Sequence, residues 1–184
     1  MRVAILVYDT CAQFEVVLAS LFIGQKHEIV TVGLDERAVT SMEGFLLKPH
    51  MLLEDLAPDS IGAFIVPGGQ PDTIKGNLIL GKKLRSFNDR KILIAAICGG
   101  PCHLGIAGLL KDRRFTSSVY KDRPEDFPGG TYVDDDIVED GNIITAHPNA
   151  YVDFALLLAK RLDAFKDQAD YDETVRCFRE FERC

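Results

Sequence analysis

One cysteine stands where an α/β protein could use it as a nucleophile. Cys98 follows a run of six apolar residues, 92–97, and precedes Gly99, Gly100 and Pro101. The run predicts a strand buried on both faces of a parallel sheet, and the helical spacing of apolar residues after Pro101 predicts a helix directly behind it. The thiol would then lie at the carboxyl edge of the sheet and at a helix N-terminus, where the helix dipole would lower its pKa and favour the nucleophilic thiolate.

The residues around Cys98 have the sizes that a strained turn requires. The spacing Ala96-x-Cys98-x-Gly100 is similar to a nucleophile elbow, with Cys in place of Ser and Ala in place of the first Gly. The alternative is that Cys98 is a small buried hydrophobe, as most free cysteines are. We favour the reactive thiol because few cysteines have this placement. Cys102, one helical turn further on, is expected to be a buried hydrophobe.

Four further residues are expected at the same edge of the sheet as Cys98. Glu15, in a helix after the first strand, could hold or share the thiol proton, or could be a solvated carboxylate. His147, after the last strand, could act as a base, or could be a loop histidine bonded to backbone. Gly69 and Gly99 could offer backbone N–H groups to an oxyanion, or could be turn residues only.

Alternating strands and helices position these residues. The pattern predicts one α/β domain with a mostly parallel sheet, whose strands are 2–8, 27–32, 63–66, 92–97 and 142–146. We expect a capping box at 10–13, helices over 77–88 and after 147–149, and a hairpin over 39–48. A second hairpin is expected between 132–133 and 136–138. The charged segment 166–184 predicts a docked terminal helix, with an apolar stripe of Tyr171, Val175, Phe178 and Phe181.

Composition narrows the class of protein. The chain has 184 residues, a net charge of −7 and 47% hydrophobic residues, which is typical of one globular domain and disfavours nucleic acid or an anionic membrane as a partner. No apolar run approaches the roughly 20 residues that span a bilayer, and no signal peptide is predicted. Five scattered cysteines disfavour a disulfide framework, so we expect a cytoplasmic protein. Cys98 and Cys102 lie four apart without a second ligand pair, and we expect neither metal nor cofactor.

Three segments together resemble a known family. Ala95-Ala96-Ile97-Cys98-Gly99-Gly100-Pro101, with Val66-Pro67-Gly68-Gly69 upstream and Gly105-Ile106-Ala107-Gly108-Leu109-Leu110 downstream, is similar to the ThiJ/PfpI family of the class I glutamine amidotransferase-like superfamily. The resemblance covers residues 1–163 and leaves 164–184 as a helical extension of the same domain. It implies a single-domain three-layer sandwich of the flavodoxin-like or amidotransferase-like kind.

The resemblance also implies roles. Cys98 would be reactive and easily oxidised, Glu15 would hydrogen-bond it, Gly69 and Gly99 would supply oxyanion-type N–H groups, and the chain would form a homodimer. Activities differ between branches of the family. The prediction is a cysteine-dependent enzyme for a small electrophilic carbonyl or acyl substrate, of glyoxalase, deglycase or hydrolase type. The alternatives are a non-catalytic oxidative-stress sensor or chaperone that uses reversible Cys98 oxidation, and a degenerate amidotransferase-like binding module.

The chain departs from the family pattern at several positions. Peptidase-like and glyoxalase-like members often carry His directly after the nucleophile, where this chain has Gly99, so peptidase activity is not expected. Other members carry a His-Pro after the strand that follows the elbow helix, and here the segment 115–119 contains no His. His147 instead resembles the catalytic His of amidotransferases, although Asn149 stands in place of the usual acid.

Overall fold

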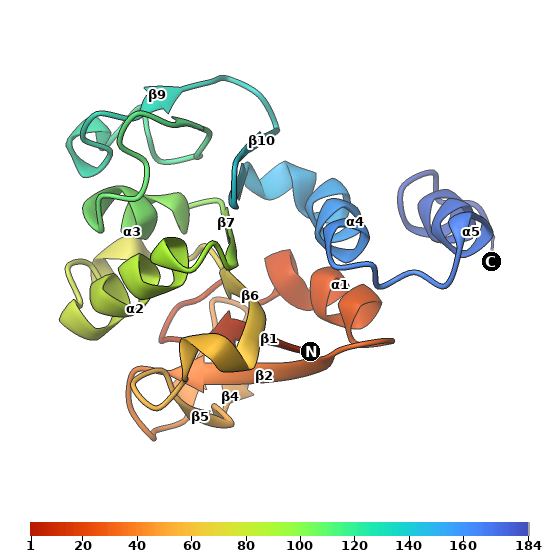
Figure 1. The fold of residues 1–184 in the computed structure, drawn as a ribbon, viewed down its shortest axis with the longest axis horizontal. Coiled ribbons are helices and arrows are strands. Elements are labelled where there is room, and N and C mark those ends of the chain that lie inside the picture. The colour runs from red at the N-terminus through yellow and green to blue at the C-terminus, as the bar shows by residue number, and fades with distance from the viewer. Residues whose placement is uncertain (184) are drawn as a thin grey trace.

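A seven-stranded sheet forms the centre of the computed structural model, which describes residues 1–183 (Figure 1). Its strand order is β10-β11-β7-β6-β1-β2-β5, and every neighbouring pair is parallel except β10 and β11. The strands are β1 (Arg2–Leu6), β2 (Glu28–Gly33), β5 (Met51–Leu52), β6 (Ile61–Val66), β7 (Leu93–Ile97), β10 (Ile137–Asp140) and β11 (Ile143–Ala146). The expected mostly parallel sheet is confirmed.

Helices cover both faces of this sheet. They are α1 (Phe14–Ile23), α2 (Leu78–Asp89), α3 (Pro101–Ile106), α4 (Tyr151–Arg161) and α5 (Gln168–Phe178). Successive strand residues point to opposite faces, so Val3 and Ile5 join the apolar cluster under α1 and α4, while Ala4 and Leu6 join the one under α2 and α3. Helices α1 and α4 lie side by side on their face (Figure 1). The predicted three-layer sandwich is therefore confirmed.

The first helix is capped differently from the prediction. Helix α1 begins at Phe14, and its N-cap residue Gln13 makes no side-chain capping bond, so the expected capping box is wrong. Instead, Glu43 Oε1 accepts the Phe14 N–H at 2.9 Å. Glu43 lies at the turn between β3 (Val39–Thr40) and β4 (Leu46–Leu47), the antiparallel hairpin that the sequence predicted. A neighbouring hairpin thus replaces the local cap.

The second predicted hairpin pairs with other partners. Strand β9 (Thr131–Tyr132) pairs in parallel with β8 (Arg114–Phe115), and β10 pairs with β11. Stacked and edge-on rings of Phe115, Tyr120, Phe127 and Tyr132 hold β9 beside β8. The β10–β11 turn contains Gly141 at φ +63°, a backbone conformation that Gly adopts without strain. Asp140 pairs with Ile143, so Gly141 and Asn142 form a two-residue loop with Gly at its first position, which is typical of a tight hairpin.

The C-terminal helix packs on the α1 side of the domain, as predicted. The Phe178 ring lies 5.0 Å from that of Phe22, edge to face, and Tyr171 and Val175 also contact this apolar cluster. Phe181, expected on the same stripe, is exposed.

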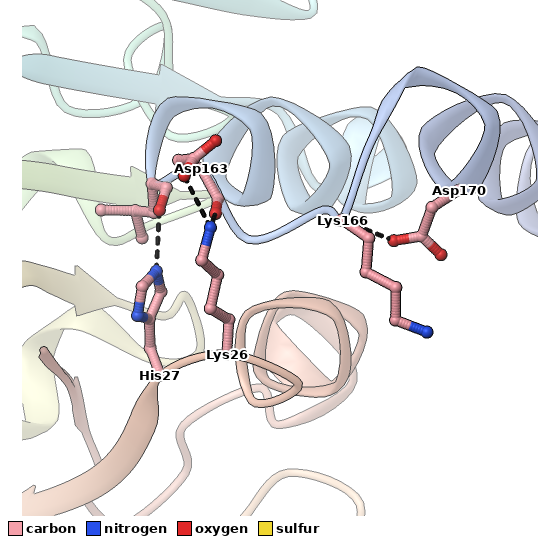
Figure 2. Close-up of polar contacts among 6 residues, drawn as sticks. Lys26, His27, Asp163, Lys166 and Asp170 are labelled. Atoms are coloured by element: carbon pink, nitrogen blue, oxygen red, sulfur yellow. Dashed lines mark hydrogen bonds and ion pairs between the residues drawn. The ribbon is translucent and has the colours of Figure 1, made fainter.

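Polar contacts join the end of α4 to the residues after α1. Lys26 bonds the Asp163 carboxylate and His27 bonds the Leu162 carbonyl (Figure 2). Within residues 1–183, no helix has the length and apolar character that crossing a bilayer requires.

Candidate active site

Cys98 occupies a strained turn between β7 and α3. Its φ is +62°, a conformation that side-chain-bearing residues rarely adopt. The backbone is fixed from two directions: its N–H donates to the Ala146 carbonyl at 2.8 Å, and its carbonyl accepts from the Ser117 hydroxyl at 2.8 Å and the Ser118 N–H at 3.2 Å. The side chain is half-buried. These bonds hold the turn in the elbow geometry that the sequence predicted.

Gly68 lets the neighbouring loop approach the sulfur. A Cβ added at Gly68 would lie 2.8 Å from Cys98 Sγ and 2.6 Å from Glu15 Oε2, closer than Cβ atoms come in proteins. The Gly68 N–H donates to Glu15 Oε2 at 2.7 Å. Its carbonyl accepts from the Tyr8 hydroxyl at 2.7 Å, so the loop is fixed on both sides. Of the adjacent glycines Gly68 and Gly69, sequence reasoning selected Gly69 and missed Gly68, where the absence of a side chain makes room for the thiol.

Glu15 lies in the first turn of α1 with only 2% of its surface exposed. It is hydrogen-bonded to both Cys98 and the Gly68 N–H. Burial raises the pKa of its carboxyl group, and these two hydrogen bonds oppose the rise. Spacing alone left open whether Glu15 faces solvent or the thiol. The structure brings it to the thiol.

The pKa of the Cys98 thiol is raised to about 11. Burial is the largest cause and the Glu15 charge the second, while hydrogen bonds from the Ser118 hydroxyl and the Gly99 N–H to the sulfur act in the opposite direction. The expectation that a helix dipole lowers this pKa is wrong, because α3 has only six residues and the sulfur is desolvated beside a carboxylate. The thiol therefore keeps its proton at neutral pH, and the adjacent Glu15 carboxylate can accept that proton when the sulfur attacks.

The two candidate oxyanion glycines lie in loops where a side chain would meet close neighbours. Gly69 has φ +126°, and a Cβ there would clash with the Thr10 carbonyl oxygen. A Cβ on Gly99 would lie 2.9 Å from Cγ of Pro71. The Gly99 N–H is bonded to the Cys98 sulfur. Close backbone approach and a positive φ thus require glycine at 69, while a side chain at 99 would have to displace the Pro71 ring. The use of either N–H by an oxyanion stays a prediction.

His147 lies next to Cys98 along the edge of the sheet, since β11 pairs with β7 up to Ala146 and Ile97. Its Nε2 is buried and has no hydrogen-bond partner within residues 1–183. No hydrogen bond joins it to Cys98 in that part of the chain. Its role as a base stays a prediction. Cys102 is fully buried, as expected.

Ser118 is a site residue that sequence reasoning missed. Its hydroxyl donates to Cys98 Sγ at 3.4 Å, within the longer reach of hydrogen bonds to sulfur. It lies in the segment 115–119, which was noted only for lacking the family's His. The signal available was the run of three hydroxyl residues, Thr116-Ser117-Ser118, in that segment.

Comparison with known proteins places this geometry in a family. The DJ-1/PfpI family matches residues 1–161. The chain belongs to the DJ-1/PfpI family. Among its relatives, the deglycase TK1284 of Thermococcus kodakarensis is 30% identical over 154 residues, which cover 80% of this chain and 91% of the relative. The uncharacterized protease YoaZ of Bacillus subtilis is 30% identical over 142 residues, covering 75% of this chain and 68% of YoaZ.

A solved structure extends the DJ-1/PfpI match to the C-terminus. The crystal structure of the DJ-1 superfamily protein Atu0886 from Agrobacterium tumefaciens superposes with a TM-score of 0.87 at 30% identity, covering 99% of this chain and 100% of that one. The match therefore includes α5, beyond the family-matched residues 1–161. The predicted ThiJ/PfpI resemblance and the flavodoxin-like fold are confirmed. Relatives named as deglycases or DJ-1 proteins support an enzymatic or stress-related role at the level of the family.

Proposed function

We propose that this chain is a cysteine-dependent enzyme that acts on a small electrophilic carbonyl or acyl substrate, of glyoxalase, deglycase or hydrolase type. The observation that carries the proposal is the buried Cys98–Glu15 pair, in which a thiol on a strained elbow faces a carboxyl group that can take its proton. Several relatives are named deglycases, which favours a carbonyl substrate.

The proposed first step is addition to a carbonyl. The Cys98 thiol transfers its proton to the Glu15 carboxylate, and the sulfur forms a bond to the carbonyl carbon while the C=O π electrons move to oxygen. The N–H groups of Gly69 and Gly99 would stabilise this oxyanion, and Glu15 returns the proton to give a neutral thiohemiacetal. His147 would carry protons in later steps through its unpartnered Nε2. A small substrate suits a half-buried sulfur, and peptidase activity remains unexpected.

Turnover of a small 2-oxoaldehyde tests the proposal. Methylglyoxal consumption by the wild type, lost in Cys98→Ser and Cys98→Ala but retained in Cys102→Ala, would support it. Cys102→Ala is the matched control because it removes a buried thiol one turn away. Equal turnover in the wild type and Cys98→Ala would refute a catalytic Cys98. Acyl esters belong in the same panel, because the hydrolase form of the proposal predicts their cleavage through the same sulfur.

The second candidate is an oxidative-stress sensor or chaperone. The Ser118 hydroxyl and the Gly99 N–H donate to the Cys98 sulfur, and the same donors would stabilise a sulfinate formed there. Absence of turnover on the panel, together with oxidation by mild peroxide confined to Cys98 by peptide mapping, would favour this candidate over the enzyme.

We also propose that the protein is a cytoplasmic homodimer without nucleic-acid or membrane partners. Large apolar side chains remain exposed on α1 and on the β3–β4 hairpin: Phe14, Val17, Leu21, Phe45 and Leu46. A second copy that covered them would bury surface that is unfavourable in water. Light scattering after size exclusion should give twice the chain mass, and Phe45→Asp should give a monomer. A monomeric wild type would refute the dimer.

A further inference from the structure

Two loops flank Cys98, one on each side. The first loop, residues 67–77, carries Gly68, whose N–H binds Glu15, and Pro71, which lies against Gly99. The second loop, residues 116–130, carries Ser117 and Ser118, which bind the Cys98 carbonyl and sulfur. The position of both loops therefore decides which groups surround the sulfur.

Ion pairs link the two loops to each other. Arg123 of the second loop bonds Asp72 of the first and also Asp126 of its own loop, the latter at 3.0 Å. Lys75 of the first loop bonds Asp126 at 2.7 Å. The side chain of Asp126 is 5% exposed and that of Arg123 is 19% exposed. Water therefore screens the attraction between these two charges less than it screens an exposed ion pair. Two ion pairs thus cross between the loops, Arg123 with Asp72 and Lys75 with Asp126, and Arg123 also holds Asp126 within its own loop.

A short run of backbone bonds connects Arg123 to the site. The Arg123 N–H donates to the Val119 carbonyl at 3.1 Å and to the Tyr120 carbonyl at 3.2 Å. These bonds close the turn that directly follows Ser118. The rings of Tyr120 and Phe127 pack in the aromatic cluster and hold this part of the chain on the core independently. Replacement of the Arg123 side chain would keep these backbone bonds and the aromatic packing, and would remove only the ion pairs that fix the turn against the first loop.

We propose that Arg123 is a positioning residue that ties the two loops together and thereby holds the Ser118 hydroxyl at the Cys98 sulfur. The proposal rests on Cys98 being the functional thiol of the proposed function. Its readout is the ionisation of that thiol, so it can be tested even if no substrate is turned over. The titratable groups around the sulfur are Glu15 on α1, Tyr8 after β1 and His147 after β11, and all three lie outside both loops.

The test is the pH dependence of Cys98 alkylation by iodoacetamide, with peptide mapping to quantify modification. Ser118→Ala removes a hydrogen bond that favours the thiolate, so its midpoint should rise by about half to one pH unit. Arg123→Met should raise the midpoint by a similar amount. Arg90→Met, which breaks an exposed arginine–aspartate pair with Asp59, should leave it unchanged.

The double variant separates positioning from other effects of the arginine. If Arg123 acts through Ser118, Ser118→Ala/Arg123→Met should have the midpoint of Ser118→Ala alone. A further rise in the double variant would show a direct charge effect and overturn the proposal. An unchanged midpoint in Arg123→Met, with or without a lower Tm, would also overturn it. Asp72→Asn, at an exposed residue, removes the Arg123–Asp72 pair without burying an unpaired charge and leaves the Lys75–Asp126 pair in place. It should shift the midpoint in the same direction, and an unshifted midpoint would count against the role of the Arg123–Asp72 pair.

Discussion

Replacing Glu15 by Gln tests the electrostatics of the site. The substitution keeps the shape of a side chain that is 2% exposed and removes its charge. The pKa of Cys98 stands about two units above the ordinary 9.0, at about 11, with burial first and the Glu15 charge second among the causes. One charge a few ångströms away commonly moves a pKa by about one to three units. Because burial persists in the variant, we expect the Cys98 pKa to fall by about one unit.

The pH dependence of Cys98 alkylation measures this shift. Peptide mapping assigns the alkylation to Cys98 among the five cysteines, of which Cys11 and Cys102 are buried. Glu28→Gln is the matched control. It removes a surface carboxylate at the amino end of β2, whereas Cys98 lies at the carboxyl end of β7, so the alkylation midpoint should not change. An unchanged or higher midpoint in Glu15→Gln would refute the reasoning, because it would mean that Glu15 is already neutral and donates its proton to a thiolate.

Three other substitutions and one pH series give further predictions. Gly68→Ala should slow Cys98 alkylation at least tenfold while circular dichroism stays native, since its Cβ would press on the sulfur; unchanged alkylation would contradict this. His147→Gln should lower turnover by about 10²-fold, because His147 is proposed to carry protons in later steps. The alkylation midpoint should not move, since His147 makes no bond to the thiol within residues 1–183, and unaltered turnover would exclude the proposed role. Phe178→Ala should cost about 2 kcal/mol in urea unfolding, and a value near zero would mean that α5 adds no stability. Glu15→Gln should raise Tm near pH 7. Because the folded-state pKa of Glu15 is raised, the contribution of this one group to stability is full at low pH and is lost as pH rises through that pKa, so the gain should vanish in acid; a gain that persists there would contradict the sign.

The elbow was predictable because local sequence determines it. A buried apolar run followed by Cys98, two glycines and Pro101 specifies strand, turn and helix within a few residues. The cap of α1 was not predictable in this way, since Glu43 comes from a hairpin 29 residues from Phe14. The partner of Ser118 likewise depends on the path of a long loop that aromatic packing sets.

The electrostatics of the site were the least accessible to sequence reasoning. A helix N-terminus favours a thiolate by a local rule, but the pKa of Cys98 follows from burial and from a carboxylate on another helix. Both depend on the finished fold. The placement of Glu15 at the thiol was an open alternative for the same reason, because the start of α1 decides which way the side chain points.

The central claim, that the Cys98 sulfur is the reacting atom, is tested most directly by partial alkylation of the wild type. Samples with graded iodoacetamide modification are assayed for 2-oxoaldehyde turnover and mapped by mass spectrometry. We predict that residual activity equals the unmodified fraction of Cys98, and that methylglyoxal slows the alkylation. Full activity in protein whose Cys98 is completely alkylated would contradict the claim.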